Sequence, residues 1–224
     1  MTVTGPATVT AAGRRHHYEQ FTSDIAALCR TPAVRVAVRA GRGRPVKDCL
    51  DAPGVLRRLA HGHGAVRAHY TVAALIALAD PFAHLRTPAG QPAAPGPGDP
   101  KSAADTPDPA STADPALGAY QGGTWRRRPN LGATLALAVR RGGWSENRTE
   151  ELLRVLARVG EDQLHRRLPA LADRLLRDNL TPDWPVLLGD LARRPFDRNE
   201  VATAWQDSFY LALPPAHPRK DPQA

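Results

Sequence analysis

Apolar side chains recur every three or four positions over most of the chain, which is the spacing of one helical face. The first such stripe begins at Tyr18, and the pattern is repeated in several segments up to Phe209. Helices are therefore predicted in both halves of the sequence. The stripes are Tyr18, Phe21, Ile25 and Leu28; Val72, Leu75, Ile76 and Leu78; Leu131, Leu135 and Ala138; Leu152, Leu156 and Val159; Leu164, Leu168, Leu171 and Leu175; Leu187, Leu188 and Leu191; and Val201, Trp205 and Phe209.

Capping residues and prolines predict several helix boundaries. Thr71 is expected to cap the helix that follows it, and Thr181-Pro182-Asp183 is expected to open another. Pro169 is expected to kink or restart the leucine-rich helix, because proline lacks the amide that a helix interior needs. "DRNE", from Asp197 to Glu200, has the pattern of a capping box. Since no strands alternate with these helices and no repeat occurs, the predicted fold class is all-α, built from helical bundles.

One segment leaves its secondary structure open. "VRVAVR", residues 34–39, alternates apolar and basic residues, which fits an edge strand as well as a helix. Its β-branched valines weaken the helical interpretation. If the segment is helical, Arg35, Arg39 and Arg42 share one face.

Residues 87–122 differ in composition from the rest of the chain. They are rich in Pro, Ala, Gly, Ser and Asp, and they carry almost no large apolar residue. Such a segment buries too little surface to offset its ordering entropy, so it is predicted to be a disordered Pro/Ala-rich insertion. The chain is therefore divided into an N-terminal helical bundle with a basic cluster (1–86), the insertion (87–122), a C-terminal helical bundle (123–213) and a flexible tail (214–224).

Charge is the property that most narrows the function. The formal net charge is +8 and the pI is about 10.3, a balance that favours a polyanionic partner. No run of about 18 apolar residues occurs, so no transmembrane segment is expected. The N-terminus lacks the order of a signal peptide. Cys29 and Cys49 are expected to be buried thiols in a cytoplasmic protein, with a single disulfide as the alternative.

The sequence does not meet the requirements of the catalytic motifs that it partly resembles. "GRGRPVKD" is no phosphate-binding P-loop, because Pro45 stands where the turn should donate amides and Asp48 follows Lys47. Glu146 and Glu150 fall at a predicted helix start, where they complement the helix dipole. No nucleophile motif is present. We therefore expect no enzyme, no cofactor and no small-molecule substrate.

The histidines are the best candidates for a metal site, but the other ligand residues of known metal motifs are not found beside them. His61, His63 and His69 have no cysteine cluster or HExxH motif beside them. They are predicted to be exposed loop residues, and His16 and His17 are expected to be solvated too. No metal is expected.

Three arginine-rich segments predict nucleic-acid binding. They are "AVRVAVRAGRGRPVKD", "WRRRP" and "VRRGGW". Arginine forks grip phosphate, and the contacts release counterions whatever the base sequence. Trp125 and Trp144 either stack on unpaired bases or pack at helix ends. The pairs 57–58, 166–167 and 193–194 lie among acids and are expected on solvated faces. The candidate phosphate contacts are Arg35, Arg39, Arg42, Arg44 and Lys47, then Arg126, Arg127 and Arg128, and finally Arg140 and Arg141.

The order and spacing of several motifs resemble a known family. "LG" (131–132) opens a helix, "ELLRVLAR" precedes a leucine-rich helix, and "PDWPVLLGDL" (182–191) combines an acid and a tryptophan. "VATAWQDSFY" (201–210) follows as a terminal aromatic helix. Together with "TPAVRVAVRAGRGRPVKD" before the insertion, they resemble the CasB family, the small subunit of the type I-E CRISPR Cascade complex. The likeness covers about residues 18–213 without 87–122. The chain departs from the family at residues 194–196, near where a tryptophan often stands, and in its valine-rich opening helix.

The resemblance implies an all-α protein that is present as two copies along the belly of Cascade. It implies contacts with the large subunit, the backbone subunits and a second copy, and with crRNA and target DNA. Family members hold the displaced DNA strand on a basic surface and are not enzymes. R-loop formation is nearly balanced in base-pairing energy, so such binding tips it forward. The alternative is an assembly protein whose basic patches dock partner subunits without touching nucleic acid. No membrane contact is expected under either hypothesis.

Overall fold

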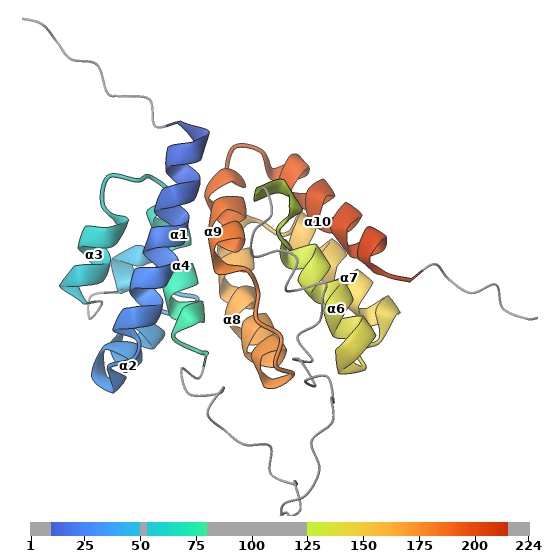
Figure 1. Cartoon of the computed structure of the whole chain (residues 1–224), viewed down its shortest axis with the longest axis horizontal. Helices are drawn as coiled ribbons and strands as arrows, with labels where there is room; N and C mark the ends of the chain where they lie inside the picture. The colour runs from blue at the N-terminus through green and yellow to red at the C-terminus, as the bar shows by residue number, and fades with distance from the viewer. Residues whose placement is uncertain (1–9, 50–52, 80–124, 215–224) are drawn as a thin grey trace, which may run out of the picture.

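The computed structural model describes residues 10–49, 53–79 and 125–214, and this part of the chain is helical without a strand (Figure 1). The all-α prediction is confirmed. The predicted insertion, residues 87–122, lies outside the described residues, as does the predicted tail after residue 214. The helices are α1 (Ala11–Leu28), α2 (Pro32–Ala40), α3 (Gly54–Ala60), α4 (Val66–Ile76), α6 (Leu131–Gly142), α7 (Glu146–Arg158), α8 (Glu161–Arg177), α9 (Trp184–Arg193) and α10 (Arg198–Ala212), with two short 3₁₀ helices, η1 (Val46–Asp48) and η3 (Trp125–Arg127).

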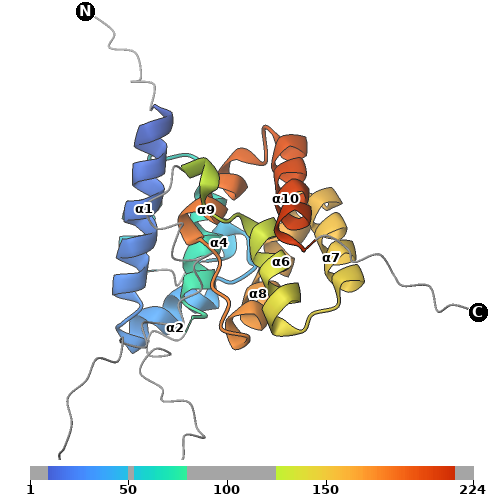
Figure 2. The same cartoon turned by 45° about the vertical axis from the view of Figure 1, so that its right-hand side comes forward.

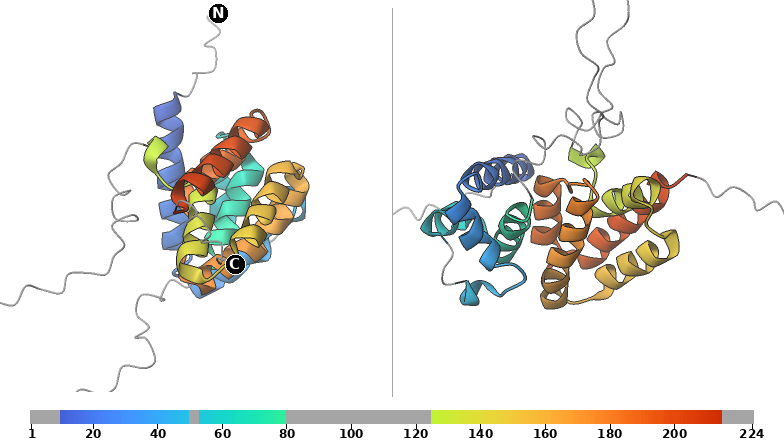
Figure 3. Two further views of the ribbon diagram at one scale, coloured as in Figure 1. Left: turned by 90° about the vertical axis from the view of Figure 1, so that its right-hand side faces the viewer. Right: turned by 90° about the horizontal axis from the view of Figure 1, so that it is seen from below.

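The helices of the two sequence halves pack against each other around one continuous core. Helices α1 to α4 lie on one side, α6, α7 and α10 on the other, and α8 and α9 between them (Figure 3, right). Figure 2 shows α1 along one edge, with α4 and α9 beside it. The apolar stripes face inward, so Phe21, Leu75, Leu135, Leu164 and Trp205 belong to a single buried cluster. No helix in the described part is both long and apolar enough to cross a bilayer.

The segment 34–39 is helical. Pro32 occupies the first turn of α2, where a missing amide costs nothing, and the helix ends at Gly41. Val38 is buried and Val34 packs against the same core, so burial outweighs the weak helix propensity of the valines. Arg35 and Arg39 share a face of α2, whereas Arg42 lies in the turn beyond the helix end.

Two predicted boundaries in the middle of the chain are wrong. Helix α4 begins at Val66, after Ala65 in a left-handed conformation (φ 41°), so Thr71 lies inside the helix. The buried Thr71 hydroxyl lies 2.6 Å from His165 Nδ1 on α8, so it serves packing rather than capping. Helix α8 does not restart at Pro169, because the leucine face that it buries holds one helix from Glu161 to Arg177.

Both predicted helix starts near the C-terminus are confirmed, but only the first has its predicted side-chain cap. Asp183 caps α9, and its carboxylate accepts from the amide of Val186 at 3.1 Å, which confirms that start. Asp197 occupies the cap position of α10 but makes no side-chain capping bond, so the capping-box prediction is wrong. The predicted core face of α10 is confirmed, because Val201, Trp205 and Phe209 are fully buried.

Several polar side chains predicted to be exposed lie in or against the core. His69 is 0% exposed, and its Nε2 lies 2.9 Å from Nε2 of His17, which is half-buried. Arg194 is fully buried too. The predictions for His17, His69 and Arg194 are wrong because the helices that cover these side chains are distant in sequence. His63 is exposed, as predicted, and its ring stacks on His17 with centroids 3.4 Å apart.

No group of three potential ligands in the described residues has the arrangement of a metal site, the histidine cluster included. The two cysteines, Cys29 and Cys49, are buried and free, as predicted.

Acid is expected to destabilise the fold through His165. Burial lowers the pKa of this ring from 6.5 to about 4, with the cationic Arg67 as a second cause. The folded state therefore holds the ring neutral while the unfolded chain takes up a proton, so stability falls as the pH drops from 6.5 toward 4. Between pH 7.5 and pH 5 the loss is about 2 kcal/mol. Urea unfolding of the wild-type protein and of His165→Gln at both pH values measures it.

The comparison between the two proteins isolates His165 from other titrating groups. Burial raises the pKa of Asp190 to about 6, which stabilises the folded state as the pH falls and has the opposite sign. This contribution is common to the wild type and the variant. His61→Gln, at an exposed loop histidine, is the matched control and should keep the wild-type pH dependence. An unchanged pH dependence in His165→Gln would contradict the assignment.

Candidate nucleic-acid interface

Five of the predicted phosphate contacts form one exposed group, which we call the α2 cluster: Arg35, Arg39, Arg42, Arg44 and Lys47. The first two project from α2, the next two from the turn after it, and the lysine from η1. All are exposed except Arg35, which is half-buried. Among the described residues none of the five takes part in an ion pair. Their charges are therefore not neutralised by nearby carboxylates.

Gly43 places this turn against helix α8. Its φ of +69° is a left-handed conformation that favours glycine, and a Cβ added there would lie 3.5 Å from Cα of Arg166. The same Cβ would lie 3.7 Å from the carbonyl oxygen of His165. Pro169, four residues later, has no amide that could donate to this oxygen. The turn thus packs on the α8 backbone and brings Arg42 and Arg44 beside Arg166.

Helix α8 carries a row of exposed arginines, which we call the α8 stripe: Arg166, Arg167, Arg174 and Arg177. Their spacing puts them within one face of the helix, opposite the buried leucines. Arg177 pairs with the neighbouring Asp173, whereas no ion pair is present at the other three in the described part of the chain. The prediction that 166–167 lie on a solvated face is confirmed. Their place beside the α2 cluster was missed, because it depends on the Gly43 contact.

The end of α6 lies at the far end of the α8 stripe. Trp144 is 6% exposed, its Nε1 donates to Asp178 at 2.5 Å, and the guanidinium of Arg174 lies 3.7 Å from the centroid of its ring. This tryptophan therefore packs at a helix end and is not available for stacking on a base. Arg140 and Arg141, in the last turn of α6, are exposed beside it, and we call them the α6 end.

The third arginine segment lies elsewhere. Nε and Nη2 of Arg128 donate to the carboxylate of Asp183 at 2.8 Å each, and Nη1 donates to Glu19 at 2.6 Å. Its guanidinium also lies 5.1 Å from the ring of Trp125, which is half-buried. Arg127 is exposed, and the side chain of Arg126 lies outside the described residues. Since Glu19 is in the first half of α1 and α2 follows the end of α1, this segment is well separated from the α2 cluster.

The α2 cluster, the α8 stripe and the α6 end together form what we call the basic surface. Arg166 and Arg174 are eight residues apart, so the surface extends about 12 Å along α8 alone. Guanidinium groups on helices can contact successive phosphates of a strand without reading its bases.

Comparisons with known proteins agree with this fold. Two solved chains, described as "CRISPR RNA-guided surveillance complex" and "CRISPR RNA-guided surveillance complex, pre-nicking", are 28% and 27% identical to this chain. Both superpose with a TM-score of 0.66 over 89% of this chain, and over 95% and 94% of their own lengths. The comparison with curated proteins gave no match.

A family comparison extends the likeness to the sequence itself. The family described as "CRISPR-associated protein Cse2" matches residues 34–210, a range that includes the α2 cluster, the α8 stripe and the α6 end. Cse2 is another name for CasB, so the match is to the family that the motifs indicated. The chain therefore belongs to the Cse2, or CasB, family of CRISPR-associated proteins.

Proposed function

We propose that this protein is a non-catalytic small subunit of a type I-E CRISPR surveillance complex and that its basic surface binds the displaced DNA strand of the R-loop. Family membership and the likeness to chains of CRISPR RNA-guided surveillance complexes support the place in such a complex. The other partners are the large subunit, the backbone subunits, a second copy, and the crRNA with its target DNA. The basic surface supports the part played by nucleic acid.

The observation that carries this proposal is the contact between Gly43 and the backbone of Arg166. It joins two arginine groups that are separate in the sequence into one surface, in which Arg177 alone among the described residues of the two groups forms an ion pair, with Asp173. Exchange of a DNA duplex for a guide–target duplex is nearly balanced in free energy, so binding of the released strand favours the open state. Because targets differ in sequence, contacts to phosphate alone suit this task.

Removal of three arginines from the basic surface is expected to weaken single-stranded DNA binding in a salt-dependent way. In the variant Arg39→Ala, Arg42→Ala, Arg166→Ala, the slope of log K against log salt should fall by roughly 2, since each phosphate contact contributes about 0.7. Fluorescence anisotropy with a labelled oligothymidine across a salt series measures the slope. A random-sequence oligonucleotide should give the same change, because no base is read.

A matched variant with the same loss of charge is Arg15→Ala, Arg158→Ala, Arg198→Ala, at exposed arginines outside the candidate phosphate contacts. Its slope should equal that of the wild type. An unchanged slope in the first variant would overturn the proposed DNA contact. If that variant also failed to co-purify with the other subunits, the basic surface would be a docking site for protein instead.

A further inference from the structure

Trp144 and Arg174 form a stacked pair within the basic surface, between the end of α6 and the last turns of α8. The guanidinium of Arg174 lies 3.7 Å from the centroid of the indole ring, which is a stacking distance. Trp144 is buried, whereas Arg174 is exposed. A guanidinium that lies on a ring keeps its N–H groups in its own plane, so their outward edges stay free to bind phosphate.

The end of α6 fixes the tryptophan in this position. Gly143 has a φ of 63°, and the amide of Trp144 donates to the carbonyl of Ala138 at 3.3 Å, as is common where a helix ends in glycine. A Cβ added at Gly142 would lie 3.2 Å from Cδ1 of Trp144 and 3.6 Å from Oδ2 of Asp178. The two glycines therefore allow the indole and this carboxylate to lie close to the α6 backbone.

Asp178 stands where an acid could pair with Arg174. The two residues are four apart at the end of α8, which is the spacing of a helical ion pair, yet no ion pair joins these two described residues. Instead, Oδ2 of Asp178 accepts from Nε1 of Trp144 at 2.5 Å. The helix dipole disfavours a carboxylate at this end of α8, so the indole N–H is the contact that accounts for its place.

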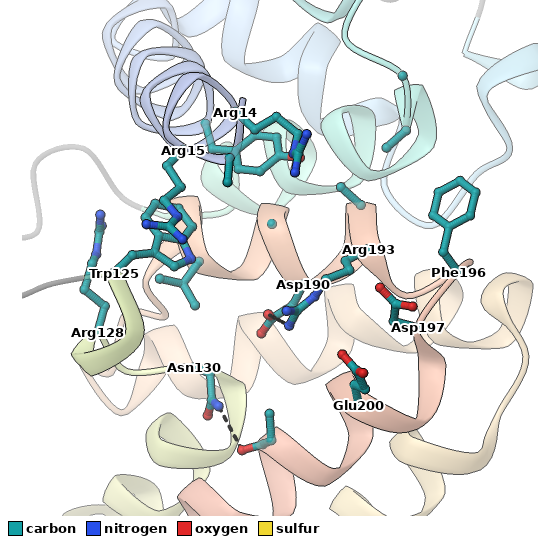
Figure 4. Close-up of a pocket in the computed structure, with 18 of the residues that line it drawn as sticks. Arg14, Arg15, Trp125, Arg128, Asn130, Asp190, Arg193, Phe196, Asp197 and Glu200 are labelled. Atoms are coloured by element: carbon teal, nitrogen blue, oxygen red, sulfur yellow. Dashed lines mark hydrogen bonds and ion pairs between the residues drawn. The ribbon is translucent and has the colours of Figure 1, made fainter. Parts of the chain in front are cut away.

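Two other arginines show what happens without such an arrangement. Arg177, three residues further along α8, is paired with Asp173. Arg128 also lies against a tryptophan, Trp125, at the wall of a cleft (Figure 4). Its guanidinium is 5.1 Å from the centroid of that ring and pairs with Asp183. In both cases a carboxylate neutralises the guanidinium, whereas at the end of α8 the indole N–H engages the nearby carboxylate.

We infer that Trp144 is a positioning residue of the basic surface and that Arg174, which it holds, binds a phosphate of the DNA strand. The ring fixes the guanidinium, and the indole N–H keeps the carboxylate of Asp178 from pairing with it. The inference rests on the proposed function, because it assigns these residues a role in the same surface. Trp144 acts from within the core and does not touch the nucleic acid.

The first test compares two arginines of the same helix by the salt dependence of binding to a labelled oligothymidine. Arg174→Ala should lower the slope of log K against log salt by roughly 0.7, the share of one phosphate contact. Arg177→Ala is the matched control, because it removes the same charge but from an arginine that is already paired with Asp173. Its slope should fall less. Equal losses in the two variants would contradict the inference, whether or not a Trp144 variant folds.

The second test isolates the indole N–H. Trp144→Phe keeps a ring beside Arg174 but releases Asp178, so the slope should fall as it does in Arg174→Ala. Adding Asp178→Asn should restore the slope, whereas the same substitution in the wild type should change it much less. Asp173→Asn is the matched control and should act alike in both backgrounds. A purely structural loss would lower the thermal midpoint without this rescue, so unfolding is followed by circular dichroism. An equal gain from Asp178→Asn in both backgrounds, or no gain in either, would overturn the role of Trp144.

The outcomes separate this inference from the proposed function. If the variant Arg39→Ala, Arg42→Ala, Arg166→Ala lowers the slope and Trp144→Phe does not, the inference is wrong and the proposed function stands. If that triple variant keeps the wild-type slope while Arg174→Ala and Trp144→Phe lower it, the proposed function is wrong and the phosphate contact at Arg174 stands. If none of these variants changes the slope, both are wrong.

Discussion

Gly132→Ala is expected to destabilise the protein by at least about 3 kcal/mol, more than an ordinary overpacking substitution. A Cβ at this position would lie 1.7 Å from the carbonyl oxygen of Trp205 and 2.6 Å from its carbonyl carbon. Both atoms belong to the α10 backbone, which no side-chain rotation can move. Helix α6 must therefore shift away from α10 for alanine to fit.

That shift is resisted at the start of α6. Nδ2 of Asn130 donates to the carbonyl of Ala204 at 3.0 Å and to Oγ of Ser208 at 2.8 Å, while its Oδ1 caps α6. One side chain thus ties the helix start to α10. Movement of α6 breaks these bonds as well as the packing of Leu135, so strain cannot be relieved cheaply.

Thermal unfolding followed by circular dichroism measures the effect, and the midpoint should fall by roughly 10 °C. Gly54→Ala is the matched control, since nothing lies within 4 Å of a Cβ there and the residue begins a helix. The control should stay within about 0.5 kcal/mol of the wild type. Failure of Gly132→Ala to fold, with the control folded, agrees with the prediction. A midpoint like that of the wild type contradicts it.

Most helices could be predicted from the sequence because each buries one face, and the spacing of that face is a local property. The rows of apolar residues on α1, α8 and α10 are examples, and each row faces the core as predicted. The secondary structure of segment 34–39 could not be predicted, because the propensity of its residues and the pattern of their burial favour different structures. Burial of Val38 in the core decides for the helix. The prediction that Thr71 caps a helix was wrong for a similar reason. In the sequence alone, a threonine whose hydroxyl bonds a distant histidine has the same pattern as a capping threonine.

The candidate site could be predicted only in part. The α2 cluster and the α6 end are contiguous runs of basic residues, so composition reveals them. The α8 stripe becomes part of the surface through the contact of Gly43 with Arg166, which pairs residues more than a hundred positions apart. The separation of Arg128 from this surface likewise follows from its pairing with Asp183 and Glu19. Neither contact can be predicted from the residues that are neighbours in the sequence.

Arg194 is the clearest case of a residue whose neighbours alone give it a role. Its side chain is 0% exposed, and Nη2 donates to the carbonyls of Leu156, Ala157 and Val159 at 2.9, 3.2 and 2.7 Å. Nε donates to the carboxylate of Glu161 at 3.0 Å. These carbonyls end helix α7, where helical partners run out. A single guanidinium therefore caps α7 and fastens α9 to the turn before α8.

Arg194→Met is accordingly expected to cost about 3–5 kcal/mol, because it leaves several carbonyls at the end of α7 and the partly buried Glu161 carboxylate without their donor. Methionine fills much of the same volume, so the loss reflects the bonds and not a cavity. Urea unfolding measures the cost in free energy. Tryptophan fluorescence is a suitable signal, because the guanidinium lies 5.7 Å from the ring of Trp205.

Two further variants separate the causes of this loss. Arg193→Met is the matched control, for that side chain is 48% exposed and its contact with Asp190 is long, so it should cost less than about 1 kcal/mol. Adding Glu161→Gln to Arg194→Met should recover part of the loss, because it removes the charge that has lost its partner. Equal destabilisation by the Arg193 and Arg194 variants would show that the buried cap does not hold these three helices together.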